Sequence, residues 1–526
     1  MHTKLILLFV FIAGVFQVVG QKKALETITV NDLKAHLEFV ASDLMQGRDF
    51  TTEVPGLDIT ADYLRTQCMK MGLKPGVDNY VQHVSMQMIK PDIDNTSFKI
   101  FNGNGETPVS TNDFFALLGP AKSDTIETGV VFAGYGWYND KTKYNDTEGV
   151  NIKGKVVLAM TRNIEQSTAD GNPGMELSME MRKLNKMLMG GAKALILVPD
   201  PLFAETNQLT SARKYSEGGQ FSLKDSPVMN TVPMPLIVGT TELADKLLHA
   251  SGKTLAQLQQ EINESGSPKS FDIEDETVQI ILPKIVSDVD GKNVVAVVEG
   301  SDPVLKNECV VYTAHYDHLG MNAKCEVYNG ADDNGTGTVS LLEIAEAFQS
   351  MKKKPARSIV FAWVTAEEKG LYGSDFYSQH PVFPLDKTLV DINLDMVGRS
   401  AETEADPNND SEDQLAGPNG LFVVTGKQST ELMTLSKDLS EDLGLVLDDK
   451  LSGKLINRSD YYHFYKHGIP VLGLSTGIHE DYHKVTDELD KIDYVKMERV
   501  VDYAFLLGEK VASQKKRIVV DKPANK

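Results

Sequence analysis

Residues 285–515 alternate between short, continuous apolar runs and longer segments with helical periodicity. The runs end at "VVYTAH", "SIVFAWVTAEE", "LVDINLD" and "GIPVLGLST". Between them lie amphipathic segments such as "GTGTVSLLEIAEAF", whose apolar residues recur on one helical face at Leu341, Ile344, Ala345 and Phe348. This alternation predicts an α/β fold, with a mostly parallel central sheet flanked by helices on both faces.

Two further regions precede this one. Residues 28–74 predict two helices, of which the first places one face at Leu33, His36, Leu37 and Val40 and the second ends at Gly72. Residues 118–280 contain short strands such as "GVVFAGYG" and "GKVVLAMT" and a methionine-rich helix. Methionines at helical spacing are typical of core packing. We therefore expect a smaller α/β domain here, without a cluster of Asp, His and Glu.

The first twenty residues have the pattern of a secretory signal peptide. Lys4 precedes the apolar stretch Leu5 to Val19, and small or tolerated residues precede Gln21. An uncleaved anchor is the alternative, but the stretch is short for a membrane span. No other long apolar run follows. We expect an exported protein, periplasmic or extracellular, with no membrane span after signal removal.

Charge and cysteine content narrow the possible partners. The formal net charge is -21, and a chain starting at Gln21 would carry -21 - 1 = -22, because Lys4 is lost. This excess of acid disfavours nucleic acid and anionic lipid as partners. Three cysteines are too few for a disulfide scaffold in a chain of this size. Cys309 and Cys325 could pair, or Cys309 could be a buried hydrophobic residue. The oligomeric state stays open.

Polar residues with metal-binding side chains follow the predicted strands. They are His315, Asp317, Asp332, Asp333, Glu367, Glu368, Asp395 and His483. Because ligands of a parallel sheet gather beyond the carboxyl ends of its strands, we expect these side chains to converge. Imidazole and carboxylate ligands without thiolate suit zinc, with manganese or cobalt as alternatives. About five such ligands exceed what one catalytic zinc uses and fit two metals sharing a carboxylate.

Each of these features also has a purely structural interpretation. His315 could be a core histidine bonded to Asp317, "GADDNGTG" could be a turn, and Asp395 could cap a loop. The adjacent Glu367 and Glu368 could simply be solvated. Taken together, however, several buried carboxylates without cations would destabilise the fold. The set as a whole therefore favours a metal site.

Six long stretches resemble the exported co-catalytic zinc aminopeptidases, a family that also contains glutamate carboxypeptidase II-like enzymes. They are "TAHYDHLG", "NGADDNGTGTVSLLEIAEAF", "RSIVFAWVTAEEKGLYGS", "INLDMVGR", "SDYYHFYKHGIPV" and "DYHKVTDELDKID". The resemblance covers about 285 to 510 and extends to "LKAHLEFVASDLMQGR". Through "AGYG", "IKGKVVL" and "GAKALILV", the second region resembles the protease-associated domain.

The resemblance implies a zinc-exopeptidase-like fold with an inserted domain. The expected boundaries are a signal peptide over 1–20, the N-terminal helices and first part of the peptidase domain over 21–117, the protease-associated domain over 118–280, the zinc peptidase domain over 281–515, and a C-terminal tail over 516–526.

The resemblance also implies two Zn²⁺ per chain and a role for each matched residue. His315 and Asp395 would bind one zinc, His483 and Glu368 the other, and Asp333 would bridge them. Asp317 would accept a hydrogen bond from the outer nitrogen of His315 and fix its tautomer. Tyr482 would help to bind the substrate carbonyl. The family often has a cis peptide after the bridging residue. Tyr461 departs from the histidine or glutamine common among relatives, at a position that is not a ligand.

Glu367 would be the general base in this scheme, because Glu368 would be neutralised by coordination. Glu367 takes a proton from the attacking water and delivers it to the departing amine. The implied reaction is hydrolysis of the N-terminal peptide bond of peptides with a free N-terminus. A carboxypeptidase or dipeptidase of the same family is the alternative. A single-zinc cyclotransferase and an inactive binding protein are disfavoured by the complete ligand set.

An acidic segment follows Asp395 and Arg399. It contains Glu402, Glu404, Asp406, Asp410, Glu412 and Asp413, without Lys or Arg. It could be a solvated surface loop, with or without a structural calcium. Alternatively, its charge would attract the ammonium of a peptide N-terminus and repel carboxylates.

Overall fold

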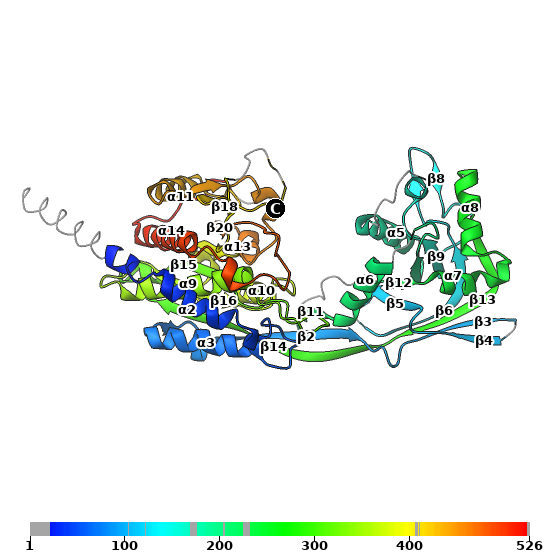
Figure 1. The fold of residues 1–526 in the computed structure, drawn as a ribbon, viewed down its shortest axis with the longest axis horizontal. Helices are drawn as coiled ribbons and strands as arrows, with labels where there is room; N and C mark the ends of the chain where they lie inside the picture. Colours follow the sequence, from blue (N-terminus) through cyan, green and yellow to red (C-terminus); the bar gives the residue numbers. More distant parts are fainter. Residues whose placement is uncertain are drawn as a thin grey trace, which may run out of the picture. The chain divides into compact units, whose positions relative to one another are not determined.

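Figure 1 shows the computed structural model, which describes residues 21–103, 105–120, 122–168, 176–203, 206–224, 232–404, 409 and 411–522. The predicted signal peptide lies outside the described residues. Clustering of the backbone divides the chain into two compact units. The first combines Met1–Ser85 with Asp290–Lys526, and the second is Met86–Val289.

The first unit is built on a sheet whose central strands are parallel. From β14 to the far edge of the sheet, the strands are β14 (Lys284–Val298), β16 (Ser358–Val364), β15 (Cys309–His315), β17 (Thr388–Leu394), β20 (Val471–Ser475), β18 (Gly420–Val424) and β19 (Val446–Asp448). β15 pairs in parallel with β16 and β17, and β17 with β20. β14 and β18 pair antiparallel with their inner neighbours.

Helices cover both faces of this sheet. One face packs against α2 (Val30–Val40), α3 (Gly56–Met71), α9 (Gly337–Ser350), α11 (Thr430–Asp442) and α14 (Tyr494–Ser513). The other packs against α10 (Tyr372–Gln379) and α13 (Tyr461–Lys466). Successive residues of β15 point to opposite faces, with Tyr312 in the first core and Val311 in the second. Burial on both faces explains why the strands read as continuous apolar runs.

The predicted helices are confirmed at their apolar positions. Leu33, Leu37 and Val40 of α2 are buried, and Thr29 caps that helix by accepting a hydrogen bond from Asp32 N. α3 ends at Gly72, whose φ of 74° suits glycine. In α9 all four predicted inward residues are buried. Cys309 is a buried free thiol and Cys325 an exposed one, so they do not pair.

The second unit has its own sheet and core. Its strands are β4 (Gly105–Val109), β3 (Ser97–Asn102), β13 (Phe271–Leu282), β6 (Asp124–Phe132), β9 (Val156–Met160), β10 (Ala194–Val198), β12 (Leu236–Gly239) and β5 (Phe114–Leu118), in that order. α5 (Leu177–Met189), α7 (Thr241–Leu248) and α8 (Leu255–Ser265) pack on it. Met187 of α5 is fully buried, as expected for core packing. β3 belongs to this unit because it pairs with β13, although it precedes the boundary expected at residue 118.

Among the helices of the described residues, none is both long enough and apolar enough to cross a membrane.

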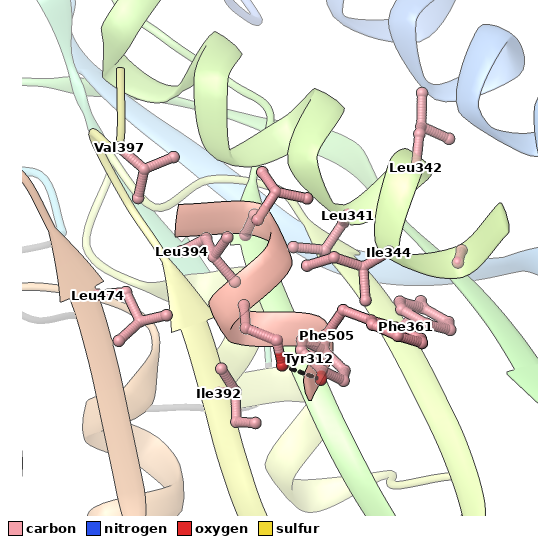
Figure 2. Packing of buried hydrophobic residues seen from close by; sticks show 14 of the residues in the cluster. Tyr312, Leu341, Leu342, Ile344, Phe361, Ile392, Leu394, Val397, Leu474 and Phe505 are labelled. Carbon is pink, nitrogen blue, oxygen red and sulfur yellow. Dashed lines mark hydrogen bonds between the residues drawn. The ribbon is translucent and has the colours of Figure 1, made fainter. Parts of the chain in front are cut away.

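Aromatic packing at the centre of the first unit fixes α9 and α14 against β15 (Figure 2). Tyr312 stacks on Phe361 with ring centroids 5.4 Å apart, and its hydroxyl donates to Ala504 O over 2.7 Å. Gly508 of α14 lies so close that a β-carbon there would overlap Tyr312 Oη. The approach of α14 to the sheet therefore requires glycine at this position.

We predict that Gly508→Ala lowers the free energy of unfolding by about 1–3 kcal/mol, because overpacking forces Tyr312 or α14 to move. Urea denaturation followed by circular dichroism measures the change. The matched control is Gly453→Ala in the short helix Ser452–Leu455, where an added β-carbon meets nothing within 4 Å. An equal loss of stability in both variants would contradict the packing explanation.

Candidate metal centre

Three parallel strands bring the predicted ligands to one edge of the sheet. His315 is the last residue of β15 and pairs in register with Val364, the last residue of β16. Glu367 and Glu368 follow β16 directly, and Asp395 follows β17. Asp333 enters from the turn Ala331–Thr336 before α9, and His483 from the segment after β20.

The Asp333 carboxylate lies between two groups of side chains. On one side, His315 Nε2 is 3.5 Å from Asp333 Oδ1 and 3.3 Å from Asp395 Oδ1. On the other side, His483 Nε2 is 3.2 Å from Asp333 Oδ2 and 3.4 Å from Glu368 Oε2. All five predicted ligands therefore lie together, with Asp333 common to both groups.

His318 is a neighbour to which sequence reasoning assigned no role. Its Nδ1 is 2.9 Å from Glu368 Oε1 and 3.8 Å from Asp333 Oδ2, and its side chain is fully buried. The signal was present in the sequence, since His318 is the second histidine of "TAHYDHLG". His318, Asp333 and Glu368 form one candidate ligand group, and the more exposed His483 lies beside the same two carboxylates.

The donor set fits a metal ion. His315, Asp333 and Asp395 form one group, and His318, Asp333 and Glu368 another, with the donor atoms of each within 4.8 Å of one another. Asp333 Oδ2 is buried and accepts no well-formed hydrogen bond. A buried carboxylate oxygen without a donor is costly, and a cation would remove that cost. Imidazole nitrogen and carboxylate oxygen are ligands that zinc accepts.

The neighbouring Asp332 faces away from these groups. Its Oδ1 accepts hydrogen bonds from Gly398 N over 2.7 Å and Thr336 Oγ1 over 2.9 Å, and its Oδ2 is 3.3 Å from His479 Nε2. The side chain of Asp332 is thus committed to the segment after β17. The peptide bond between Asp333 and Asn334 is cis, as the resemblance implied.

Asp317 acts on a different partner from the expected one. His315 Nδ1 lies 3.2 Å from the backbone oxygen of Asp317, whereas the nearest carboxylate oxygen is 3.8 Å away. The predicted bond to the Asp317 carboxylate is therefore wrong. That carboxylate instead accepts hydrogen bonds from Glu367 N over 3.1 Å and Glu368 N over 3.2 Å. It holds the turn that carries both glutamates.

The two adjacent glutamates have opposite electrostatic environments. Burial raises the pKa of Glu367 well above its usual value, and the negative charge of Glu368 raises it further. Burial also acts against the charge of Glu368, but hydrogen bonds from His318 and His483 outweigh it and hold the pKa well below its usual value. Glu368 is therefore the ionised member, and Glu367 is the member that favours a proton.

Tyr482 stacks on His483, with ring centroids 3.8 Å apart and an angle of 23° between the planes. It also lines a mostly apolar pocket, whose other lining residues include Asp395, Met396, Val424, Leu474 and Ile478. Burial raises the pKa of the Tyr482 hydroxyl, so it stays protonated near neutral pH. Tyr461 lines the same pocket and donates its hydroxyl to Leu455 O over 2.6 Å.

The buried carboxylate of Asp487 holds the backbone of Asp333 in place. Asp487 Oδ2 accepts hydrogen bonds from Asp332 N and Asp333 N, both over 3.0 Å. Arg399 Nη1 lies 3.6 Å from Asp487 Oδ1. Burial raises the pKa of Asp487 to about 6, although the hydrogen bond that the Asp333 amide donates to it acts in the opposite direction.

The acidic segment is described only in part. Asp406 and Asp410 lie outside the described residues. Glu404 Oε1 accepts hydrogen bonds from the backbone and side-chain nitrogens of Asn419, each over 3.1 Å. The role of this segment in attracting substrates stays a prediction.

Comparison with known proteins gives consistent similarities. Residues 293–507 match the model described as Peptidase family M28. Leucine aminopeptidase 2 of Trichophyton equinum is 32% identical over 187 residues, which are 35% of this chain and 33% of that protein. The chain thus spans about a third of the length of the curated relatives it matches first.

Two solved structures share the fold along most of the chain. The aminopeptidase from Aneurinibacillus sp. strain AM-1 has a TM-score of 0.54 and 18% identity, covering 96% of this chain and 100% of that one. The zinc aminopeptidase BSAP from Bacillus subtilis has a TM-score of 0.51 and 17% identity, covering 95% and 98%. At these identities the likeness shows an α/β fold in common.

We predict that Asp333→Asn lowers the bound metal more than either Asp395→Asn or Glu368→Gln, because Asp333 contributes to both groups. Metal analysis after zinc loading and dialysis measures the effect, with circular dichroism as the check on folding. Asp332→Asn, one residue away and pointing elsewhere, is the control and should retain more metal than Asp333→Asn. Equal losses in these two variants would contradict the assignment of Asp333.

Proposed function

We propose that this protein is a zinc-dependent aminopeptidase that hydrolyses the N-terminal peptide bond of peptides and binds two Zn²⁺ per chain. The observation that carries the proposal is the Asp333 carboxylate shared by two histidine–carboxylate groups, beside a separate half-buried glutamate, Glu367. The match to Peptidase family M28 over residues 293–507 supports it. So does the word aminopeptidase in the names of the similar proteins.

Each residue has a role in this scheme. His315 and Asp395 would hold one zinc, His483 and Glu368 the other, and Asp333 both, while His318 orients Glu368 through its Nδ1 contact. Bound zinc would supply Lewis acidity, which lowers the pKa of a water from about 15.7 towards 7 and polarises the scissile carbonyl.

Glu367 carries out the proton transfers. Its carboxylate takes a proton from water while the water oxygen bonds to the scissile carbonyl carbon. The carboxylic acid then gives that proton to the amide nitrogen as the C–N bond breaks, releasing an amine and a carboxylic acid, whose remaining proton passes to the solvent. The Tyr482 hydroxyl would donate a hydrogen bond to the carbonyl oxygen.

The pocket beginning at Asp395 would receive the side chain of the N-terminal residue. Its lining is mostly apolar, which supports an apolar side chain there. The free ammonium of the substrate's N-terminal residue would pair with carboxylates of the site. Peptides with a free N-terminus are therefore the proposed substrates. Export to the periplasm or the outside of the cell is part of the proposal, supported by the composition of residues 1–20. The identification of residues 118–280 as a protease-associated domain is also part of the proposal, supported by "AGYG", "IKGKVVL" and "GAKALILV".

A carboxypeptidase or dipeptidase is the second candidate, and one observation favours it. Arg458 lines the same pocket with an exposed side chain, and the ion pairs of the described residues include none with its guanidinium. An unpaired guanidinium could bind a C-terminal carboxylate. The direction of cleavage therefore has to be tested.

A panel of blocked and unblocked substrates tests the proposal. We expect aminoacyl anilides to be cleaved and their N-acetyl counterparts to be resistant, because acetylation removes the ammonium. Chelation should abolish the activity, zinc should restore it, and metal analysis should approach two ions per chain. Release of the C-terminal residue from an N-blocked peptide would favour the second candidate, and Arg458→Met should then raise its KM. Full activity with one ion per chain would contradict the shared-carboxylate scheme.

We predict that Glu367→Gln lowers kcat by about 10²–10⁴-fold while zinc content stays at the level of the unmodified protein, because glutamine keeps the shape but cannot take a proton. Glu368→Gln is the matched control one residue along, and it should lose zinc. Steady-state kinetics and metal analysis on the same preparations measure both effects. The assignment fails if Glu367→Gln retains its rate or if the two variants lose zinc equally.

A further inference from the structure

We infer that Arg48 is a positioning residue of the metal centre, holding in register two of the backbone turns that carry its ligands. The inference rests on the proposed metal centre. Arg48 lies outside residues 293–507, the part of the chain that matches the family model. It belongs to the segment "QGRDF" between α2 and α3.

The guanidinium of Arg48 is fully buried and donates to four backbone carbonyls. Nε donates to Tyr316 O over 2.8 Å, and Nη2 to Gly330 O over 2.9 Å. Nη1 donates to Val40 O over 2.9 Å and to Asn329 O over 2.6 Å. One side chain thus joins the end of α2 to Tyr316 and to Asn329–Gly330, which lie 268 to 282 residues beyond Arg48. A planar fork of donors can do this, and a lysine ammonium cannot.

Two of these segments carry candidate ligands. Tyr316 stands between His315 and the pair Asp317–His318. Asn329 and Gly330 lead directly into Asp332 and Asp333. A shift of either carbonyl would move the groups that face each other across the site. Metal–ligand distances can deviate from their ideal values by only a few tenths of an ångström. The register of these turns therefore affects metal affinity.

The backbone around Arg48 adds to the same connection. Arg48 O accepts a hydrogen bond from His318 N over 3.1 Å, and Gly47 O accepts one from Gly320 N over 3.0 Å. Gly47 has a φ of 71° and Arg48 a φ of 48°. A β-carbon at Gly47 would overlap the backbone of Gly320. The segment therefore lies directly against the turn that follows β15.

The charge of Arg48 also acts on the site. In the described part of the chain, no carboxylate lies within ion-pair distance of it, so its nearest partners are carbonyl dipoles. Burial lowers the pKa of Arg48 to about 10, while Asp333, Asp317, Asp487 and Glu368 raise it. The guanidinium is therefore charged at neutral pH. It offsets part of the carboxylate charge without occupying a ligand position.

A buried arginine could instead serve stability alone, and Arg357 provides the comparison. Arg357 is 1% exposed, donates to Glu308 Oε2 over 2.7 Å and also to Gln514 O. It precedes β16 at Ser358, whereas Glu367 and Glu368 follow the other end of that strand. Loss of Arg357 therefore reports what removing a buried arginine does far from the site.

Zinc affinity of the metal-free protein tests the inference. We would prepare Arg48→Lys, Arg48→Met and Arg357→Met, and measure the zinc dissociation constant by competition with a chromophoric chelator. The unfolding midpoint of each metal-free variant is measured alongside. We expect both Arg48 variants to bind zinc about 10- to 100-fold more weakly, as is typical when a group supporting metal ligands is removed. Arg357→Met should lower the unfolding midpoint and leave zinc affinity unchanged.

Each other result has a definite meaning. Folded Arg48 variants with unchanged zinc affinity would overturn the inference, as would an equal loss of affinity in Arg357→Met. Failure of both Arg48 variants to fold would also overturn it, because Arg48 would then serve the fold as a whole. If the unmodified protein itself binds no zinc, the proposed metal centre fails, and that outcome is distinct from the others.

Discussion

Buried negative charge at the carboxyl edge of the parallel strands is the constraint on which the rest of this structure depends. The side chains of Asp317, Asp332 and Asp487 are fully buried, and that of Asp333 is 4% exposed. Carboxylates in such surroundings are costly unless hydrogen bonds or cations compensate them. Backbone amides, histidines and the buried guanidinium of Arg48 supply part of that compensation. The remainder, at Asp333 Oδ2, is what a metal ion would supply.

Three of the carboxylates do structural work by holding the turns that carry the others. Asp317 accepts hydrogen bonds from the amides of Glu367 and Glu368. Asp487 accepts them from Asp332 and Asp333, and Asp332 accepts one from Gly398, which follows Asp395. Each of these three residues therefore fixes a turn that bears a carboxylate facing the centre. The geometry of the centre is set by this reciprocal network as well as by the strands.

The sheet gives that network a rigid base. Because β15, β16 and β17 are buried on both faces, their carboxyl ends have little freedom to move. The hydrogen bond from Tyr312 to Ala504 ties β15 to α14, whose close approach to the sheet depends on Gly508. The N-terminal segment before residue 50 then closes one side of the site through Arg48. The support of the metal centre thus extends to Arg48, which lies outside the part that matches the family model.

The sequence by itself determined the class of the fold and the residue types of the site. Continuous apolar runs imply strands buried on both faces, and polar residues after those runs imply a shared edge, since both follow from local patterns and chain connectivity. Only the tertiary structure decided how those side chains divide their work. It turned Asp332 towards Gly398, gave the Asp317 carboxylate to two amides, and brought His318 and Arg48 to the centre. Sequence spacing does not encode which of two neighbouring carboxylates meets a given partner, because that depends on side-chain direction and on segments hundreds of residues away, such as the turn at Arg48.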